Sequence, residues 1–339
     1  MKVALLEVSH WHFPLYQEAL LAADIDVVAV SDANEATRSR IASAFNANAY
    51  QSPQALLAGE SALDYVFAFG RHGALKDTGL ALVERGIPFA IENPGGVNAA
   101  EVGALVTAAE AKGLPVAVAF VQRVGPLFQA LQRLQNEEGA EFRHSSWRFF
   151  AGPSGRYRTM DTPWMLDPVE SGGGCLINLA PHWLDLTRLL HGPVEGPVLG
   201  RTSNALHGET VEDYAMVSTS HARGSAMVEA GYCFPDHPRK REYSFSLAGP
   251  VHYVQSRADE IEIFRLGTAA PEVLTFDLDS DPLYGVFVDR VLADHAGSRP
   301  PVAGLSDLEA VMKSVDTAYA SSRPGSNIIG SCLAEGIFS

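Results

Sequence analysis

His182 and Asp185 are the two residues of this sequence best suited to proton transfer. They lie three residues apart in the stretch Asn178 to Leu190, which is predicted to be a helix, so both fall on nearly the same face. An imidazole with a pKa near neutrality can accept or donate a proton, and a carboxylate beside it could orient the ring or bind a substrate. The alternative is a buried His–Asp pair with a purely structural hydrogen bond.

Other polar residues occupy predicted loops where they could hold an anion or a polyol. Arg71 and His72 follow a predicted strand, and Arg123 lies where the character of the chain changes. Arg158 belongs to a loop flanked by glycine and proline, where a guanidinium could bind a carboxylate through paired hydrogen bonds. Each of these residues could equally be a solvated loop residue.

Histidines and carboxylates also raise the question of a metal ion. His10, His12, His182 and Asp185 provide suitable ligand types, but their spacing matches no standard zinc pattern. We therefore expect no metal site.

The elements that must position these residues change in character along the chain. Up to about Val121, short apolar runs alternate with helix-like stretches. The runs are 3–6, 27–30, 47–50, 65–69, 89–91 and 116–120, and the helix-like stretches are 14–21, 35–45, 75–85 and 99–112, with a helix start at Ser52-Pro53. This alternation predicts right-handed crossovers and a doubly wound parallel sheet, a Rossmann dinucleotide-binding domain over residues 1–121.

Residues 122–339 have a different pattern, typical of a second, α+β domain that binds substrate or forms oligomers. Strand-like segments linked by polar turns predict a large, mainly antiparallel open sheet. They are 142–150, 212–220, 225–232, 243–248 and 260–264. A last helix at about 305–321 could pack back on the first domain.

The first loop of a Rossmann domain normally carries three glycines, and this chain lacks them. Glu7, Ser9 and His12 occupy the three glycine places, which usually provide a tight turn, close approach to a pyrophosphate and close helix packing. Backbone N–H groups at the start of the following helix could still bind an anion, although Glu7 would repel one.

Asp32 follows the second strand, where a dinucleotide fold places an acid on the ribose hydroxyls. A carboxylate there disfavours the extra phosphate of NADP and so favours NAD. The alternative is that Asp32 caps the helix that starts near Glu35.

Four motifs occur in a characteristic order: Ser31-Asp32, Glu92-Asn93-Pro94, Gly172-Gly173-Gly174 followed by His182-Trp183-Leu184-Asp185, and Arg299-Pro300-Pro301-Val302. Together with the two-part organisation, they resemble the Gfo/Idh/MocA oxidoreductases over essentially the whole chain. The resemblance implies a nicotinamide cofactor and a sugar, inositol or similar polyol-type substrate. In that family the second motif is Glu-Lys-Pro, and an Asp precedes the His by four residues.

The resemblance also implies roles for single residues. His182 matches the general acid/base, Asn178 the catalytic Asp, and Asn93 the Lys that bridges cofactor and substrate. An asparagine can hydrogen-bond a hydroxyl or carboxamide, but it cannot supply positive charge or take a proton. We expect the cofactor to contact Val8, Ser9, His10, Trp11, Asp32, Arg71, His72 and Glu92, and the substrate to contact Arg123, Arg158 and Asp185.

The composition limits which binding partners and which cellular compartment we expect. The net charge of −15 would repel phosphate backbones and anionic lipid, so we expect neither nucleic acid nor a membrane as partner. Three widely spaced cysteines, and a strand pattern directly after Met1-Lys2, favour a reducing, cytoplasmic location.

The sequence therefore predicts an NAD-dependent oxidoreductase, with NADP less favoured, that acts on a sugar-like alcohol or ketone with His182 as proton donor and acceptor. One alternative is a non-catalytic family member that binds a sugar or nucleotide as a sensor or regulator. Another is non-redox chemistry with a tightly held nucleotide, because the fold alone does not fix the reaction. An open sheet with one face to cover predicts a homodimer or homotetramer through the C-terminal sheet.

Overall fold

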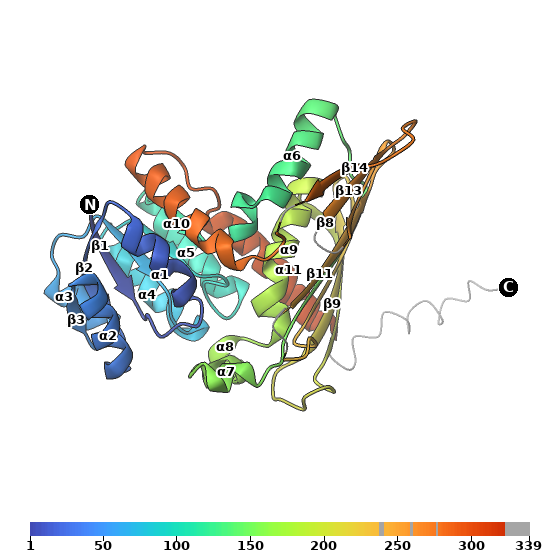
Figure 1. Ribbon diagram of the computed structural model, residues 1–339. Helices are drawn as coiled ribbons and strands as arrows, with labels where there is room; N and C mark the ends of the chain where they lie inside the picture. The colour runs from blue at the N-terminus through green and yellow to red at the C-terminus, as the bar shows by residue number, and fades with distance from the viewer. Residues whose placement is uncertain (237–240, 258–259, 276, 323–339) are drawn as a thin grey trace.

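The structure, a computed structural model, describes residues 1–236, 241–257, 260–275 and 277–322. A small parallel sheet with its helices forms one side of the molecule, and a large sheet seen edge-on forms the other (Figure 1). Helices α6 (Pro126–Glu138), α9 (Cys175–His191) and α11 (Leu305–Ser322) lie between these two parts.

The first sheet is the predicted doubly wound parallel sheet. Its order is β3-β2-β1-β4-β5-β6, and every pair is parallel. The strands are β1 (Lys2–Leu6), β2 (Asp26–Ser31), β3 (Asn48–Tyr50), β4 (Tyr65–Ala68), β5 (Phe89–Ile91) and β6 (Val116–Val118). The helices between them are α1 (Phe13–Ala22), α2 (Glu35–Phe45), α3 (Pro53–Gly59), α4 (His72–Glu84) and α5 (Ala99–Ala111).

Three of these helices begin at residues that satisfy the first free backbone N–H groups. The side chains of Asn34, Ser52 and Asn98 each accept a hydrogen bond from the backbone N–H three residues later, at the starts of α2, α3 and α5. The N-cap of α2 is thus Asn34 and not Asp32, which leaves Asp32 for another contact.

The second sheet has the order β14-β13-β12-β11-β7-β10-β9-β8 and is antiparallel except between β7 and β10. The predicted, mainly antiparallel open sheet is therefore confirmed. Its strands are β7 (His144–Ala151), β8 (Val194–Ser203), β9 (Tyr214–His221), β10 (Gly224–Gly231), β11 (Arg241–Ala248), β12 (His252–Arg257), β13 (Glu260–Arg265) and β14 (Glu272–Thr275). The sequence did not predict β8, β12 or β14.

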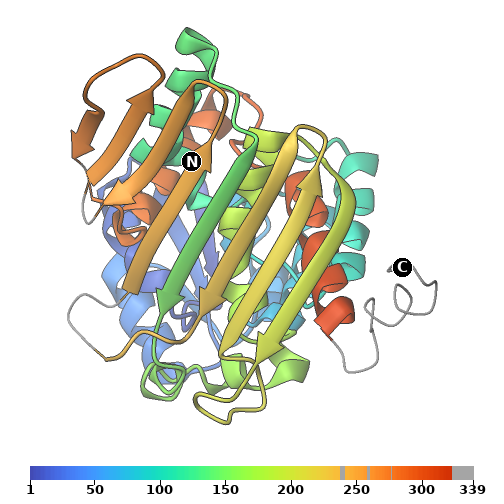
Figure 2. The same cartoon turned by 90° about the vertical axis from the view of Figure 1, so that its right-hand side faces the viewer.

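Helices cover one face of this sheet, and Figure 2 views the other face, which no described helix crosses. Helix α9 packs on β9, β10 and β7, while α11 packs against β8 and also against α5 of the first sheet. The helical segments of this half are η1 (Val121–Val124), α6 (Pro126–Glu138), α7 (Arg156–Thr159), η2 (Pro163–Leu166), α8 (Pro168–Ser171), α9 (Cys175–His191), α10 (Asp281–Ala296) and α11 (Leu305–Ser322).

Helix α10 comes from the second half of the chain but packs on α1. Its buried side chains Leu283, Tyr284 and Phe287 join the same apolar core as Phe13 and Tyr16 of α1. This packing brings Tyr284 next to the loop that follows β1.

Candidate active site

The candidate site lies where the parallel strands of the first sheet end. Parallel strands place their carboxyl ends at one edge, so the loops after β1, β4 and β5 meet there. These loops carry residues 7–12, His72 and Glu92-Asn93. Helix α9, with Asn178 and His182, faces them from the second half of the chain.

The loop after β1 keeps the conformation of a glycine turn without its glycines. Glu7 has a φ of 58°, in the left-handed region that favours glycine. Burial, and then the nearby Asp32 carboxylate, raise the pKa of Glu7 to about 7. The first glycine place therefore holds a strained, partly buried carboxyl group.

Ser9, at the second glycine place, binds Asp32 twice. Its backbone N–H lies 2.5 Å from one carboxylate oxygen and its hydroxyl 2.6 Å from the other. The Asn34 backbone N–H donates to that second oxygen at 2.8 Å, and Asp32 is only 2% exposed. Both oxygens of the predicted ribose-binding carboxylate are thus already engaged within the protein.

Most backbone N–H groups of this loop also point inward. Besides the Ser9 N–H, five N–H groups of residues 7–13 donate to acceptors inside the protein. The donors are Glu7 and Val8 to Ser31 O, His10 to Glu7 O, His12 to His10 Nδ1, and Phe13 to His10 O. Few N–H groups thus remain free to bind a pyrophosphate.

His12, at the third glycine place, joins a buried chain of hydrogen bonds. Its Nδ1 lies 3.2 Å from Glu92 Oε2, and its Nε2 lies 3.0 Å from the Tyr284 hydroxyl. Tyr16 donates to the other Glu92 oxygen at 2.6 Å. Burial lowers the pKa of His12 well below its usual value and raises the pKa of Glu92.

Three further histidines surround this chain. Burial lowers the pKa of His10 to about 3, and those of His72 and His182 to about 4, so all three rings are neutral at pH 7. His72 Nδ1 lies 2.8 Å from the Ser171 carbonyl oxygen. Among the described residues, His10 Nε2 and His182 Nδ1 have no hydrogen-bond partner.

His10, His12 and Glu92 bring ligand-type atoms within 4.8 Å of one another. Both ring nitrogens of His12 already take part in hydrogen bonds, and the His10 Nδ1 accepts one from the His12 N–H. The arrangement is therefore that of a hydrogen-bonded cluster.

The two asparagines that stand at family catalytic positions are both buried. Asn178 donates from Nδ2 to the hydroxyls of Tyr157, at 2.7 Å, and Tyr232, at 3.0 Å. The Asn93 side chain is 4% exposed, and its Oδ1 lacks a partner in the described part of the chain. Asn178 is thus fixed from the second half of the chain, whereas Asn93 keeps a free acceptor.

Two adjoining cavities lie at this site. The larger, of about 770 Å³, is lined by the predicted cofactor residues Val8, Ser9, His10 and Trp11. The smaller, of about 40 Å³, is lined by His12, Asn178, His182 and Tyr284. Both are bounded by the same four residues, Trp11, Arg156, Arg241 and Asp281.

Arg71 and Arg158, both predicted to bind ligand, are exposed and pair with nearby carboxylates. Arg71 lies 3.8 Å from Glu170, and Arg158 makes a paired contact with Glu209 at 2.6 and 2.7 Å. Neither arginine lines the two cavities. Exposed pairs of this kind add little stability and do not by themselves indicate a site.

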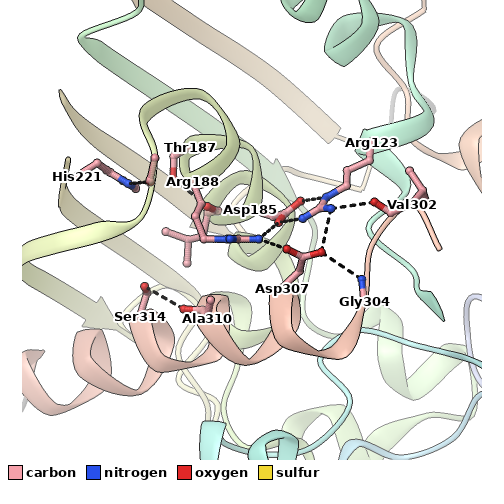
Figure 3. A network of polar contacts seen from close by, with 12 residues as sticks. Arg123, Asp185, Thr187, Arg188, His221, Val302, Gly304, Asp307, Ala310 and Ser314 are labelled. Carbon is pink, nitrogen blue, oxygen red and sulfur yellow. Dashed lines mark hydrogen bonds and ion pairs between the residues drawn. The ribbon is translucent and has the colours of Figure 1, made fainter. Parts of the chain in front are cut away.

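Arg123 and Asp185 bind each other (Figure 3). Arg123 donates to both Asp185 oxygens at 2.6 Å, to Asp307 at 3.0 Å and to the Val302 carbonyl at 2.8 Å. Arg188 completes the network through Asp307. Since η1, α9 and α11 each contribute a residue, the network joins these three elements instead of facing either cavity.

The sequence did not indicate Tyr16, Tyr284 or Arg241 as site residues. Tyr284 and Arg241 reach the site from α10 and β11. The signal available in the sequence was the helical spacing of Leu283, Tyr284 and Phe287, which α10 buries.

Comparisons with known proteins agree with this architecture. Residues 9–120 match a family model described as an oxidoreductase family with an NAD-binding Rossmann fold, and residues 132–249 match a GFO/IDH/MocA C-terminal domain. A protein of Amycolatopsis mediterranei (strain S699), described as a UDP-kanosamine synthase oxidoreductase subunit, is 32% identical over 187 residues. That match covers 54% of this chain and 49% of the relative, about half its length.

Solved structures show the same fold over 95% of the chain. A levoglucosan dehydrogenase in complex with NADH and levoglucosan has a TM-score of 0.83, 18% identity and 97% coverage of its own chain. A UDP-N-acetylglucosamine 3-dehydrogenase from Acidithiobacillus ferrooxidans has a TM-score of 0.76, 19% identity and 97% coverage. Among the described residues, no helix is both long and apolar enough to cross a bilayer.

Proposed function

Because the chain belongs to the Gfo/Idh/MocA oxidoreductases, we propose that it is an NAD-dependent dehydrogenase or reductase of a sugar-like alcohol or ketone. The observation that carries this proposal is the pair of adjoining cavities. The larger follows the loop after β1 and the start of α1, as a dinucleotide site does, and the smaller contains His182 and Asn178.

The larger cavity fits a dinucleotide in size, since small-molecule and cofactor sites commonly occupy 300–1,000 Å³. Residues Val8–Trp11 would lie along it, and Thr37 and Arg40 would border its far end. The bound nicotinamide would supply hydride transfer, which no side chain can perform. Asp32 would disfavour the extra phosphate of NADP, so NAD remains the proposed cofactor.

His182 is the proposed proton donor and acceptor in the smaller cavity. It is neutral at pH 7, because burial lowers its pKa to about 4, and it can therefore accept a hydrogen bond from a carbinol. Asn178 and Asn93 would orient hydroxyl or carboxamide groups without exchanging protons. A cavity of about 40 Å³ holds only a few water molecules, so a sugar ring would enter after Trp11 or Arg156 moves aside.

The substrate class and the assembly are proposals supported by the relatives and by the sheet. The relatives named above act on sugars or nucleotide sugars, which favours a sugar-like substrate. Exposed residues alternate with buried ones along the strands, which places Leu199, Met227, Tyr253 and Val273 on the face of the large sheet away from its helices. A homodimer or homotetramer through this face would cover them. Light scattering of the purified protein would give the assembly directly.

Titration of the purified protein with NADH, followed by fluorescence and calorimetry, tests the cofactor. We expect saturable binding and, with NAD⁺ and a sugar panel, turnover that His182→Ala reduces by at least about 10²-fold. His144→Ala is a matched control, because this exposed histidine contacts only Ser225 among the hydrogen bonds of the described chain. Absence of saturable binding at millimolar NADH would refute the proposal.

A second candidate, a non-catalytic sensor of a sugar or nucleotide, is favoured by the engaged Asp32 and by Asn93 and Asn178. In that case the wild-type protein would bind ligand without redox turnover. The double variant Asn93→Lys with Asn178→Asp would then create turnover or raise it.

A further inference from the structure

We propose that Tyr284, His12 and Glu92 form a proton relay that opens into the smaller cavity. The inference rests on the proposed function and revises one part of it, the destination of the proton. Among the described residues, His182 Nδ1 has no hydrogen-bond partner that would stabilise a protonated ring, whereas His12 Nδ1 lies 3.2 Å from the Glu92 carboxylate. His12 is therefore better placed than His182 to hold the proton.

The three side chains form a continuous chain of hydrogen bonds in the order Tyr284, His12, Glu92. Tyr284 and His12 both line the cavity, and the Tyr284 hydroxyl lies 3.0 Å from His12 Nε2. On the other side of the ring, His12 Nδ1 lies 3.2 Å from Glu92 Oε2. A single tautomer satisfies both contacts, with Nδ1–H donating to Glu92 and Nε2 accepting from Tyr284.

Glu92 forms the carboxylate end of this relay: burial raises its pKa, and the hydrogen bond from Tyr16 favours its charged form. Tyr16 donates to its second oxygen at 2.6 Å, so both oxygens accept a hydrogen bond. Glu92, His12 and Tyr284 are 2%, 7% and 3% exposed, which keeps water away from the contacts. A base held in position by a buried carboxylate is the arrangement that activates nucleophiles and proton acceptors in many enzymes.

Several other charged or titratable groups influence His12. Asp281 favours its protonated form, whereas Arg241, Arg156 and His72 disfavour it. Neighbouring His10 and His182 are neutral at pH 7. Asp281 and the Glu92 carboxylate, which lies 3.2 Å from the ring Nδ1, are therefore the groups available to stabilise an imidazolium.

The proposed step balances as follows. When the substrate carbinol is oxidised, its C–H hydrogen leaves as hydride to the nicotinamide acceptor and its O–H proton moves to the Tyr284 oxygen. The Tyr284 proton moves at the same time to His12 Nε2, and Glu92 stabilises the resulting imidazolium. Burial raises the pKa of Tyr284 well above its usual value, so the phenol stays neutral before and after the step. His182 then holds the reacting oxygen by a hydrogen bond.

Variants of the full-length protein test the relay by kinetics. With NAD⁺ and levoglucosan, UDP-glucose or UDP-N-acetylglucosamine as probes, Tyr284→Phe and His12→Gln should lower kcat about 10²- to 10⁴-fold. Glu92→Gln keeps the shape but loses the charge, and should lower kcat at least about tenfold, with a smaller change in KM. Tyr65→Phe, a buried tyrosine at the opposite end of β4, is the matched control.

These outcomes separate the relay from the function itself. If the wild-type protein turns over a probe and Tyr284→Phe retains kcat within about twofold, the relay is wrong while the dehydrogenase stands. If the wild-type protein neither binds NADH nor turns over any probe, the proposed function fails. The relay is then judged by a second measurement that needs no substrate.

Histidine-selective ¹⁵N NMR provides that measurement. The His12 signals are identified by their loss in His12→Gln, and we expect a neutral ring with its proton on Nδ1 at pH 7. Tyr284→Phe should shift the Nε2 signal selectively. A proton on Nε2, a charged ring, or a stoichiometric transition metal that is lost from His12→Gln would overturn the relay.

Discussion

Replacing Ser9 by glycine should restore a ribose-binding carboxylate and tighten NADH binding. In the wild-type protein the Ser9 hydroxyl occupies an Asp32 oxygen at 2.6 Å, and its Cβ fills the place where a glycine would let a nucleotide approach. Glycine removes both obstacles but keeps the backbone N–H that binds the other oxygen. One Asp32 oxygen then keeps only the Asn34 contact and can accept a ribose hydroxyl.

The expected gain follows from the hydrogen bonds exchanged. A hydrogen bond to a charged group contributes about 1.5–3 kcal/mol, and the freed oxygen gains one from the ribose. The greater backbone flexibility of glycine reduces this gain in binding free energy by about 0.5–1 kcal/mol. The net gain is therefore about 1.4 kcal/mol, which corresponds to a Kd for NADH about tenfold lower. The Kd for NADPH should not fall, because Asp32 repels its additional phosphate.

Isothermal titration of NADH and NADPH into both proteins measures this gain. Ser9→Ala is the matched control. It removes the hydroxyl but keeps the Cβ, so its Kd for NADH should fall less than that of Ser9→Gly. Adding Asp32→Asn to Ser9→Gly should cancel the gain. An unchanged or higher Kd in Ser9→Gly, or a gain that survives Asp32→Asn, would show that Asp32 does not bind the ribose.

Two further predictions concern stability and are measured by urea denaturation. The pKa of Glu7 is raised to about 7 in the folded protein, so the folded state binds more protons than the unfolded state between pH 4.5 and 7. Relative to Glu7→Gln, the wild-type protein should therefore lose about 2–3 kcal/mol of stability as pH rises through this window. The buried histidines titrate in the opposite sense but do so in both proteins, so their contribution cancels in this comparison. Arg123→Met removes both 2.6 Å hydrogen bonds of the buried Asp185 carboxylate and leaves it an ion pair with Arg188 at 3.7 Å. The loss should cost about 3–5 kcal/mol, and adding Asp185→Leu should restore most of it. The exposed Arg158→Met should cost less than about 1 kcal/mol, and a similar loss for both arginines would contradict the argument.

The fold of the first domain could be predicted because its signals are local. Buried apolar runs indicate the strands, and Ser52-Pro53 marks the start of a helix, which the structure places at Pro53 with Ser52 as its N-cap. The strands of the second half of the chain were harder to predict from the sequence. Strand β8 contains Gly196, Pro197 and Gly200, so it shows neither the alternation nor the composition expected of a strand. Residues 194–203 form a strand because they pair with β9 and pack against α11, contacts that a local sequence pattern does not reveal.

The site was predictable in place but not in detail. Spacing and resemblance identified the loop after β1, Glu92, Asn178 and His182. The loop, Asn178 and His182 line the two adjoining cavities, and Glu92 lies behind them in contact with His12. The partners of these residues could not be read from the sequence. Tyr284 is 272 positions away from His12, and only the packing of α10 on α1 brings the two side chains together.

The three replaced glycines point to a rebuilt site. If these positions had only stopped binding a cofactor, any side chain that fits the loop would be sufficient there. Here Ser9 engages both oxygens of the Asp32 carboxylate, and His12 contacts an oxygen of Glu92 while accepting from Tyr284. The proposed effect of the first change is on cofactor binding and that of the second is on proton transfer, so the two have separable consequences. Ser9→Gly should change the Kd for NADH with little effect on kcat, whereas His12→Gln should change kcat with little effect on that Kd. If both variants altered only stability, the loop would be a structural plug and the sensor function would be favoured.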